Sequence, residues 1–262
     1  MTPIAVHHEV TGPPQAPVVL LSGSLGTSLS MWDPVVPLLA EHFRVVRYDH
    51  RGHGRSPVPP GRWTIDDLGC DAIALLDRLG VQRAHVVGLS VGGMVGMWLA
   101  AAAPDRVAGL VAMCTSAHLE PRAAWAERAR LVEERGMSAV ADIVLERWFT
   151  PAFRRLHPER VEAVRQSLLA TPVAGYAACC RAIESMDLRP LLPRICTDVL
   201  AVAAEQDPAT PAVHAHRIAA AVPAARVVVI PRAAHLASVE QPEVTAELVL
   251  RHFGAVPAGA QR

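Results

Sequence analysis

The chain has 262 residues, of which 51% are hydrophobic, enough for one large α/β domain that carries an inserted subdomain. Its 25 basic and 25 acidic residues give a formal net charge of +0, which offers no positive surface for nucleic acids or anionic membranes. No apolar run is long enough to span a bilayer, and the first residues lack a signal-peptide pattern. Composition therefore predicts a soluble, cytoplasmic protein without nucleic-acid or membrane partners.

The cysteines form an odd, scattered set without the spacing of a metal site. Cys179 and Cys180 are adjacent, which is a poor geometry for an ordinary disulfide. We expect free thiols in a reducing compartment. The set comprises Cys70, Cys114, Cys179, Cys180 and Cys196.

Near-continuous apolar, β-branched runs alternate with longer helical patterns along the chain. Such runs are typical of parallel strands that helices cover on both faces. They span residues 16–23, 43–49, 83–90, 107–115, 197–205 and 225–231. Helical patterns occupy residues 32–43, 64–80, 91–104, 212–222 and 241–253. Residues 4–10 alternate between polar and apolar side chains, which fits an antiparallel edge strand.

Residues 117 to about 193 break this alternation, because they contain helix-like segments and no convincing strand. The segments span residues 121–135, 137–149, 158–170 and 173–186, and prolines separate them. We expect a lid over the carboxyl edge of the sheet, where open α/β sheets bind ligands. The predicted organisation is a core of residues 1–116 and 194–262 with a helical insertion of residues 117–193. The tail from Gly254 onward is expected to fray.

Ser90 lies in the run Gly88-Leu89-Ser90-Val91-Gly92, between an apolar strand and a helical pattern. A serine at such a junction commonly caps the helix by accepting a backbone N–H bond. A nucleophile on a tight strand-to-helix turn takes a strained backbone conformation instead, and flanking glycines remove side chains that would clash there. Because a cap needs no glycine two residues upstream, this context favours a catalytic serine.

A serine nucleophile needs a base, and an acid must orient that base. Asp207 follows the predicted strand at 197–205, although an Asp-Pro turn is its alternative role. Glu205 is the alternative acid, since it lies closer to the end of that strand. Among the twelve histidines, His235 alone combines a late position with a loop that follows a strand. The predicted catalytic residues are therefore Ser90, Asp207 and His235.

An oxyanion hole requires two N–H donors aimed at the developing negative charge. The backbone N–H of Val91, directly after the nucleophile, is the first expected donor. The second should come from the loop after the strand at 16–23, and Leu25 is the leading candidate.

Over essentially its whole length, the chain resembles α/β-hydrolases. The shared features are residues 48–56 (YDHRGHGRS), 88–93 (GLSVGG) and 100–111, together with the Asp207 and His235 loops. Further segments, including 146–154 and 171–183 of the expected lid, resemble 3-oxoadipate enol-lactonases of bacterial aromatic catabolism. One departure lies in the loop that supplies Leu25, where many relatives carry His-Gly and this chain has Gly23-Ser24.

The resemblance implies an α/β-hydrolase fold, with a mostly parallel sheet of the eight-stranded type flanked by helices. It also implies opening of 3-oxoadipate enol-lactone to 3-oxoadipate, in the protocatechuate and catechol branches, without a metal or organic cofactor. The expected partner is thus a small lactone or ester that bears a carboxylate. Trp125 fits the family's lid pattern, and Arg128 and Trp148 are further candidates for substrate binding. The alternative role of the two tryptophans is packing within the lid. The alternative for Arg128 is a solvated position on the lid surface.

The sequence is compatible with three rival functions. The same triad would serve a broad-specificity carboxylesterase or a cofactor-free enzyme of the perhydrolase and haloperoxidase type. A ligand-binding or sensing protein built on a hydrolase scaffold is the rival from a different class. An intact triad argues against that non-catalytic role.

Overall fold

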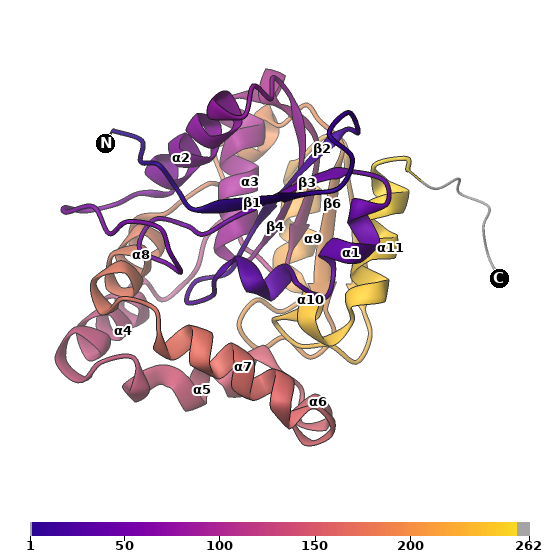
Figure 1. The fold of residues 1–262 in the computed structure, drawn as a ribbon. Coiled ribbons are helices and arrows are strands. Elements are labelled where there is room, and N and C mark those ends of the chain that lie inside the picture. Colours follow the sequence, from indigo (N-terminus) through magenta and orange to yellow (C-terminus); the bar gives the residue numbers. More distant parts are fainter. Residues whose placement is uncertain (1, 256–262) are drawn as a thin grey trace.

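The computed structural model describes residues 2–255, in which one twisted sheet is flanked by helices and a further group of helices lies at one end (Figure 1). The sheet has seven strands in the order β1-β3-β2-β4-β5-β6-β7. They are β1 (His8–Thr11), β2 (Val18–Ser22), β3 (Arg44–Tyr48), β4 (Ala84–Leu89), β5 (Val107–Met113), β6 (Val199–Ala204) and β7 (Ala225–Ile230). β1 runs antiparallel to β3, and every other pairing is parallel.

All six apolar runs form the parallel strands that the sequence predicts, and the antiparallel edge strand is also confirmed, slightly downstream of residues 4–10. The sheet described has one strand fewer than the eight-stranded type. Residues 2–7 form no strand, and two of their N–H groups bond to side chains instead of to a neighbouring strand. The N–H of Ile4 donates to Asp71 and that of His7 donates to Ser56.

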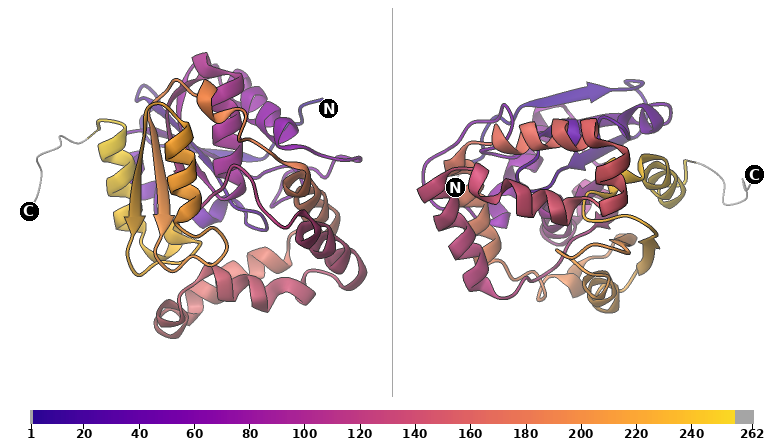
Figure 2. Two further views of the ribbon diagram at one scale, coloured as in Figure 1. Left: turned by 180° about the vertical axis from the view of Figure 1, so that it is seen from behind. Right: turned by 90° about the horizontal axis from the view of Figure 1, so that it is seen from below.

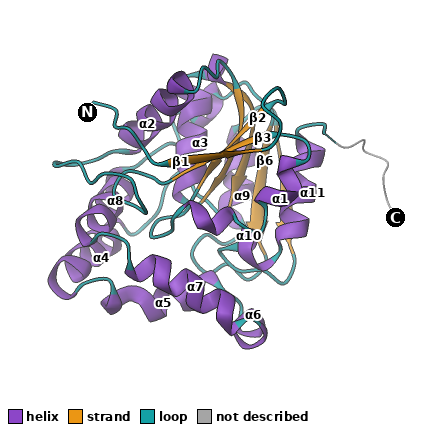
Figure 3. Cartoon of the chain, in the orientation of Figure 1, coloured by secondary structure: helices purple, strands orange, loops and turns teal. Residues whose placement is uncertain are grey.

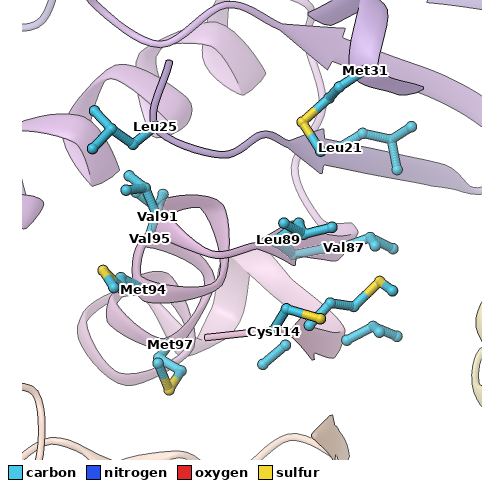
Figure 4. Packing of buried hydrophobic residues seen from close by; sticks show 14 of the residues in the cluster. Leu21, Leu25, Met31, Val87, Leu89, Val91, Met94, Val95, Met97 and Cys114 are labelled. Atoms are coloured by element: carbon cyan, nitrogen blue, oxygen red, sulfur yellow. The ribbon is translucent and has the colours of Figure 1, made fainter. Parts of the chain in front are cut away.

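Helices cover both faces of the sheet because the central strands are buried on each side. The covering helices are α1 (Val36–Ala40), α2 (Ile65–Arg78), α3 (Val91–Ala102), α9 (Val213–Ala221) and α11 (Pro242–His252), with α10 (Ala237–Glu240) and the short turns η1 (Leu29–Trp32), η2 (Pro104–Arg106) and η3 (Leu192–Arg194) between elements. α1 packs beside α11, α2 packs beside α3, and α9 packs on β6 and β7. Figure 4 shows part of the core, where α3 packs between the loop after β2 and the end of β5.

A second group of helices, here called the α4–α8 layer, forms the end of the molecule below the sheet in Figures 1 and 3. Its members are α4 (Arg122–Arg135), α5 (Ser138–Trp148), α6 (Pro151–Leu156), α7 (Pro158–Leu169) and α8 (Val173–Ser185). The views of Figure 2 show the same grouping from behind and from below. Helix α6 was not predicted, because Pro151 was read as a break between helices. Proline is well tolerated at the first helical position, and the Thr150 side chain caps this helix.

None of the helices within residues 2–255 combines the length and the apolar character that crossing a bilayer requires. The expected fraying after Gly254 falls almost entirely on residues 256–262, which lie outside the described part of the chain.

Candidate active site

Ser90 follows β4 and directly precedes α3, with a backbone conformation of φ 59° and ψ −115°. Among the described residues, only three non-glycine residues have a positive φ, and Ser90 is one of them. Its side chain makes no capping hydrogen bond to the helix, whereas its backbone is held by Met113 and Thr115. The geometry thus speaks against the helix-cap role. Strain of this kind is typical of functional residues on strand-to-helix turns.

The glycines around Ser90 allow backbone segments to approach more closely than any side chain would permit. A Cβ on Gly88 would lie 2.1 Å from the carbonyl oxygen of Gly92, and a Cβ on Gly92 would lie 2.0 Å from that of Ser22. A Cβ on Gly93 would lie 2.7 Å from the Thr115 side chain. Both tightest contacts are with backbone atoms, which cannot rotate away. The sequence pattern around the serine therefore has a steric cause.

His235 and Asp207 lie together in the loops that follow β7 and β6. His235 Nδ1 is 2.8 Å from Asp207 Oδ2, and both residues are about 4% exposed. Thr210 donates its hydroxyl to the same Oδ2 at 2.7 Å, while the backbone N–H groups of Ala209 and Thr210 donate to Oδ1. Burial raises the pKa of Asp207, but attraction to His235 and these hydrogen bonds outweigh it and lower the pKa to about 2. Asp207 is thus a carboxylate at neutral pH.

Glu205, the alternative acid, lies elsewhere. It is exposed, and its Oε2 accepts the backbone N–H of Arg232 at 2.8 Å. The structure therefore brings Asp207, and not Glu205, to the imidazole. Thr210 is a site residue that the sequence analysis missed. Its signal was the spacing Asp207-Pro-Ala-Thr210, in which a hydroxyl three residues after an aspartate can fold back onto the carboxylate.

A cavity of about 400 Å³ is lined by most of the predicted site residues, although not by Asp207 or Val91. Ser90, His235 and Leu25 line it from the loops at the carboxyl ends of the strands. The α4–α8 layer supplies the opposite wall, including the three predicted substrate contacts Trp125, Arg128 and Trp148 and also Arg147, Val144 and Tyr176. The volume is that of a small-molecule site.

The N–H groups expected to form the oxyanion hole are those of Val91 and Leu25. Within residues 2–255, neither N–H has a hydrogen-bond acceptor. The loop that carries Leu25 is tied to the start of α3, because Gly92 N–H donates to the carbonyl of Gly23 at 2.9 Å. Leu25 and Val91 belong to the same buried cluster (Figure 4). Two free donors therefore lie on adjoining segments beside Ser90.

His50 supports this loop from beneath, although the sequence analysis assigned it no site role. Its Nε2 lies 3.2 Å from the Gly23 carbonyl and 3.3 Å from Ser22 Oγ. Burial, reinforced by the nearby His53, lowers the pKa of His50 to about 3 despite the bond to Gly23. A neutral imidazole with its hydrogen on Nε2 therefore donates to the same carbonyl that accepts from Gly92.

Two arginines of the α4–α8 layer bring positive charge to the cavity. The Arg128 guanidinium lies 4.8 Å from the centre of the Trp125 ring. The Arg147 side chain, which also lines the cavity, forms no ion pair or hydrogen bond within the described residues. Trp148 is only 5% exposed, and its backbone is bonded to the His235 loop, since Leu236 N–H donates to Trp148 O at 3.0 Å.

The His, Cys, Asp and Glu side chains of residues 2–255 form no group of three or more that could hold a metal ion. All five cysteines are unpaired, as expected, and three of them are buried. Burial raises the pKa of the Cys179 thiol to about 12, so this thiol stays protonated.

Comparisons with known proteins agree with this architecture. A family model described as the alpha/beta hydrolase fold matches residues 16–242. A protein of Acinetobacter baylyi named 3-oxoadipate enol-lactonase 2 is 38% identical over 253 residues, which cover 95% of this chain and 94% of that protein.

Solved structures show the same relationship. The enol-lactonase from Burkholderia xenovorans LB400 superposes with a TM-score of 0.93 at 38% identity, covering 96% of each chain. A thermophilic esterase from Thermogutta terrifontis reaches a TM-score of 0.91 at 30% identity, covering 96% of this chain and 94% of that one. With the family model spanning most of its length, this chain belongs to the α/β-hydrolase fold family.

Proposed function

We propose that this enzyme opens 3-oxoadipate enol-lactone to 3-oxoadipate, with Ser90 as nucleophile, His235 as general base and Asp207 as the acid that orients it. One observation carries the proposal: a strained serine lines the same small-molecule cavity as His235, whose Nδ1 is held by the buried Asp207 carboxylate. The names of the 38%-identical relatives support this substrate.

The first chemical step is attack on the lactone carbonyl. Ser90 Oγ bonds to the carbonyl carbon while its proton passes to Nε2 of His235, and Asp207 holds the hydrogen on Nδ1. The N–H groups of Val91 and Leu25 then donate to the oxyanion. Losing one donor of this kind typically costs ~3 kcal/mol of transition-state stabilisation.

Collapse of the tetrahedral intermediate breaks the ring C–O bond. The enol oxygen that leaves takes the proton from His235, and the enol ketonises, which makes reclosure unfavourable. Water, deprotonated by His235, then attacks the ester carbonyl at Ser90. Collapse of this second tetrahedral intermediate breaks the bond to Ser90 Oγ, which takes the proton back from His235, and the released acid ionises to the carboxylate product. His235 thus acts twice as base and twice as acid, which requires the Asp207 contact in every step.

We propose that residues 117–193 serve as a lid on a core of residues 1–116 and 194–262. In this division the lid supplies substrate specificity, because Trp125, Arg128 and Trp148 line the cavity opposite Ser90. A substrate carboxylate needs a cation, and Arg147 supports this role because it lines the cavity without a described partner. We further propose a cytoplasmic role in bacterial aromatic catabolism, which the resemblance to 3-oxoadipate enol-lactonases and the composition support.

The deciding experiment measures loss of the enol-lactone by spectrophotometry beside hydrolysis of p-nitrophenyl esters of graded chain length. Rapid lactone opening with poor ester turnover supports the proposal. The reverse pattern would make the protein a carboxylesterase, and negligible turnover of both classes would favour a binding protein. Ser90→Ala should lose nearly all activity and still fold, because the Ser90 side chain makes no structural hydrogen bond to α3.

A further inference from the structure

Glu240, at the end of α10, is a buried carboxylate that the proposed mechanism does not use. The residue is 8% exposed, and no arginine or histidine within residues 2–255 forms an ion pair with it. Three hydrogen-bond donors surround it instead. Oε1 accepts the backbone N–H of Thr150 at 2.7 Å and the Thr150 hydroxyl at 2.9 Å, and Oε2 accepts the backbone N–H of Ala234.

Every one of these contacts requires Glu240 to accept. The Thr150 hydroxyl itself accepts the N–H of Phe153 at the start of α6, so its own hydrogen is directed to Glu240. Both carboxylate oxygens are therefore engaged by donors from different parts of the chain. A glutamine has one acceptor oxygen, and its NH₂ group would face either Thr150 or Ala234 donor to donor. Burying a carboxylate costs free energy unless hydrogen bonds compensate for the lost water. The three contacts are therefore needed to keep Glu240 buried.

The three contacts join the loop that carries His235 to the turn between α5 and α6. Ala234, directly before His235, is bonded to Glu240 and through it to Thr150. Leu236, directly after His235, donates its N–H to Trp148 O at 3.0 Å. Both neighbours of the imidazole are thus fixed to residues 148–150. The same turn follows Arg147 and Trp148, which line the cavity.

We propose that Glu240 is a positioning residue, which holds the His235 loop against the α5–α6 turn so that the base and this wall of the cavity keep one relative position. Glu240 does not line the cavity and acts through Ala234 and Thr150. The inference rests on the proposed role of His235 as base. It makes no assumption about which ester or lactone occupies the cavity.

The test compares Glu240→Gln with Glu243→Gln, which makes the same chemical change at an exposed site three residues away on α11. Rates are expressed per active serine, titrated with a fluorophosphonate, so that loss of folded protein does not count as loss of turnover. We expect Glu240→Gln to lower kcat roughly 10- to 100-fold with KM changed less than about twofold. Glu243→Gln should match the wild type.

A purely structural role predicts a different result, namely lower thermal stability with an unchanged kcat per active serine. That result in Glu240→Gln would overturn the inference. Should this variant fail to fold, Thr150→Val and Thr150→Ser decide the question, since only serine keeps the hydroxyl donor. We expect kcat to fall in the valine variant and to be retained in the serine variant, and equal kcat values would overturn the inference. If the wild type hydrolyses p-nitrophenyl esters and not the lactone, the substrate proposal fails while this comparison proceeds on the ester.

Discussion

The surroundings of Asp207 determine what Asp207→Asn will do. Oδ1 accepts the backbone N–H groups of Ala209 at 2.8 Å and Thr210 at 3.1 Å, and Oδ2 accepts from the Thr210 hydroxyl and from His235. An asparagine side chain has one acceptor oxygen and one NH₂ group. The backbone donors cannot reverse, so the oxygen will stay with them and the NH₂ will face His235.

The imidazole must then accept at Nδ1, which places its hydrogen on Nε2. That nitrogen is the one that must take the Ser90 proton, so the variant holds the wrong tautomer. We expect kcat to fall about 10⁴-fold, the size seen when this aspartate is replaced in a serine protease triad. This corresponds to about 5 kcal/mol of lost transition-state stabilisation.

The assay is turnover of the preferred ester or lactone per folded molecule, with circular dichroism and thermal unfolding measured in parallel. Glu205→Gln is the control, because the amide oxygen can still accept the N–H of Arg232 at this exposed site. We expect the control to remain within about twofold of wild-type activity. If Asp207→Asn kept a tenth or more of the activity, or if Glu205→Gln lost as much as Asp207→Asn, the reasoning on the triad would be wrong.

Three further predictions concern the turn, the cavity and the pH dependence of stability. Gly92→Ala should cost about 1–3 kcal/mol of stability and about 100-fold in kcat, because its Cβ would lie 2.0 Å from the backbone oxygen of Ser22. Gly96→Ala on the same helix is the control, since its Cβ meets only side-chain atoms, the nearest a Leu110 methyl group at 2.7 Å, and we expect mild effects in denaturation and rate assays. Arg147→Met should raise KM for the carboxylate-bearing lactone about tenfold and leave KM for an uncharged p-nitrophenyl ester unchanged, with the exposed Arg155→Met as control. Because the pKa of Asp207 is lowered from 3.8 to about 2, its contribution of about 2 kcal/mol is present above pH 3.8 and lost as the pH falls through about 2. Acid titrations of the free energy of unfolding should therefore show a shallower decline in Asp207→Asn than in the wild type.

The sequence allowed the strands and most helices to be predicted, because periodicity and proline placement are local properties. Where prediction failed, a local signal had two meanings. Pro151 ends one helical pattern and, with Thr150 as cap, also begins α6. The start of the chain looked like a strand from residue 4, yet its first residues bond to Asp71 and Ser56 side chains far along the chain.

The residues of the candidate site differ in the same way, because some carry a signal in the neighbouring sequence and others do not. The glycines around Ser90 could be interpreted from the sequence because a tight strand-to-helix turn leaves no room for flanking side chains. The structure shows the cause, since a Cβ on Gly88 or Gly92 would lie 2.0–2.1 Å from a backbone oxygen. Glu240 carried no such signal, since its partner Thr150 lies 90 positions away and a glutamate near a helix end has many ordinary roles. Steric exclusion at a turn can be recognised from residues that are neighbours in the sequence. A hydrogen-bonded link between two loops exists only once the fold has brought them together. This is why the proposed nucleophile can be picked out before the fold is known, and the residue proposed to position its base only afterwards.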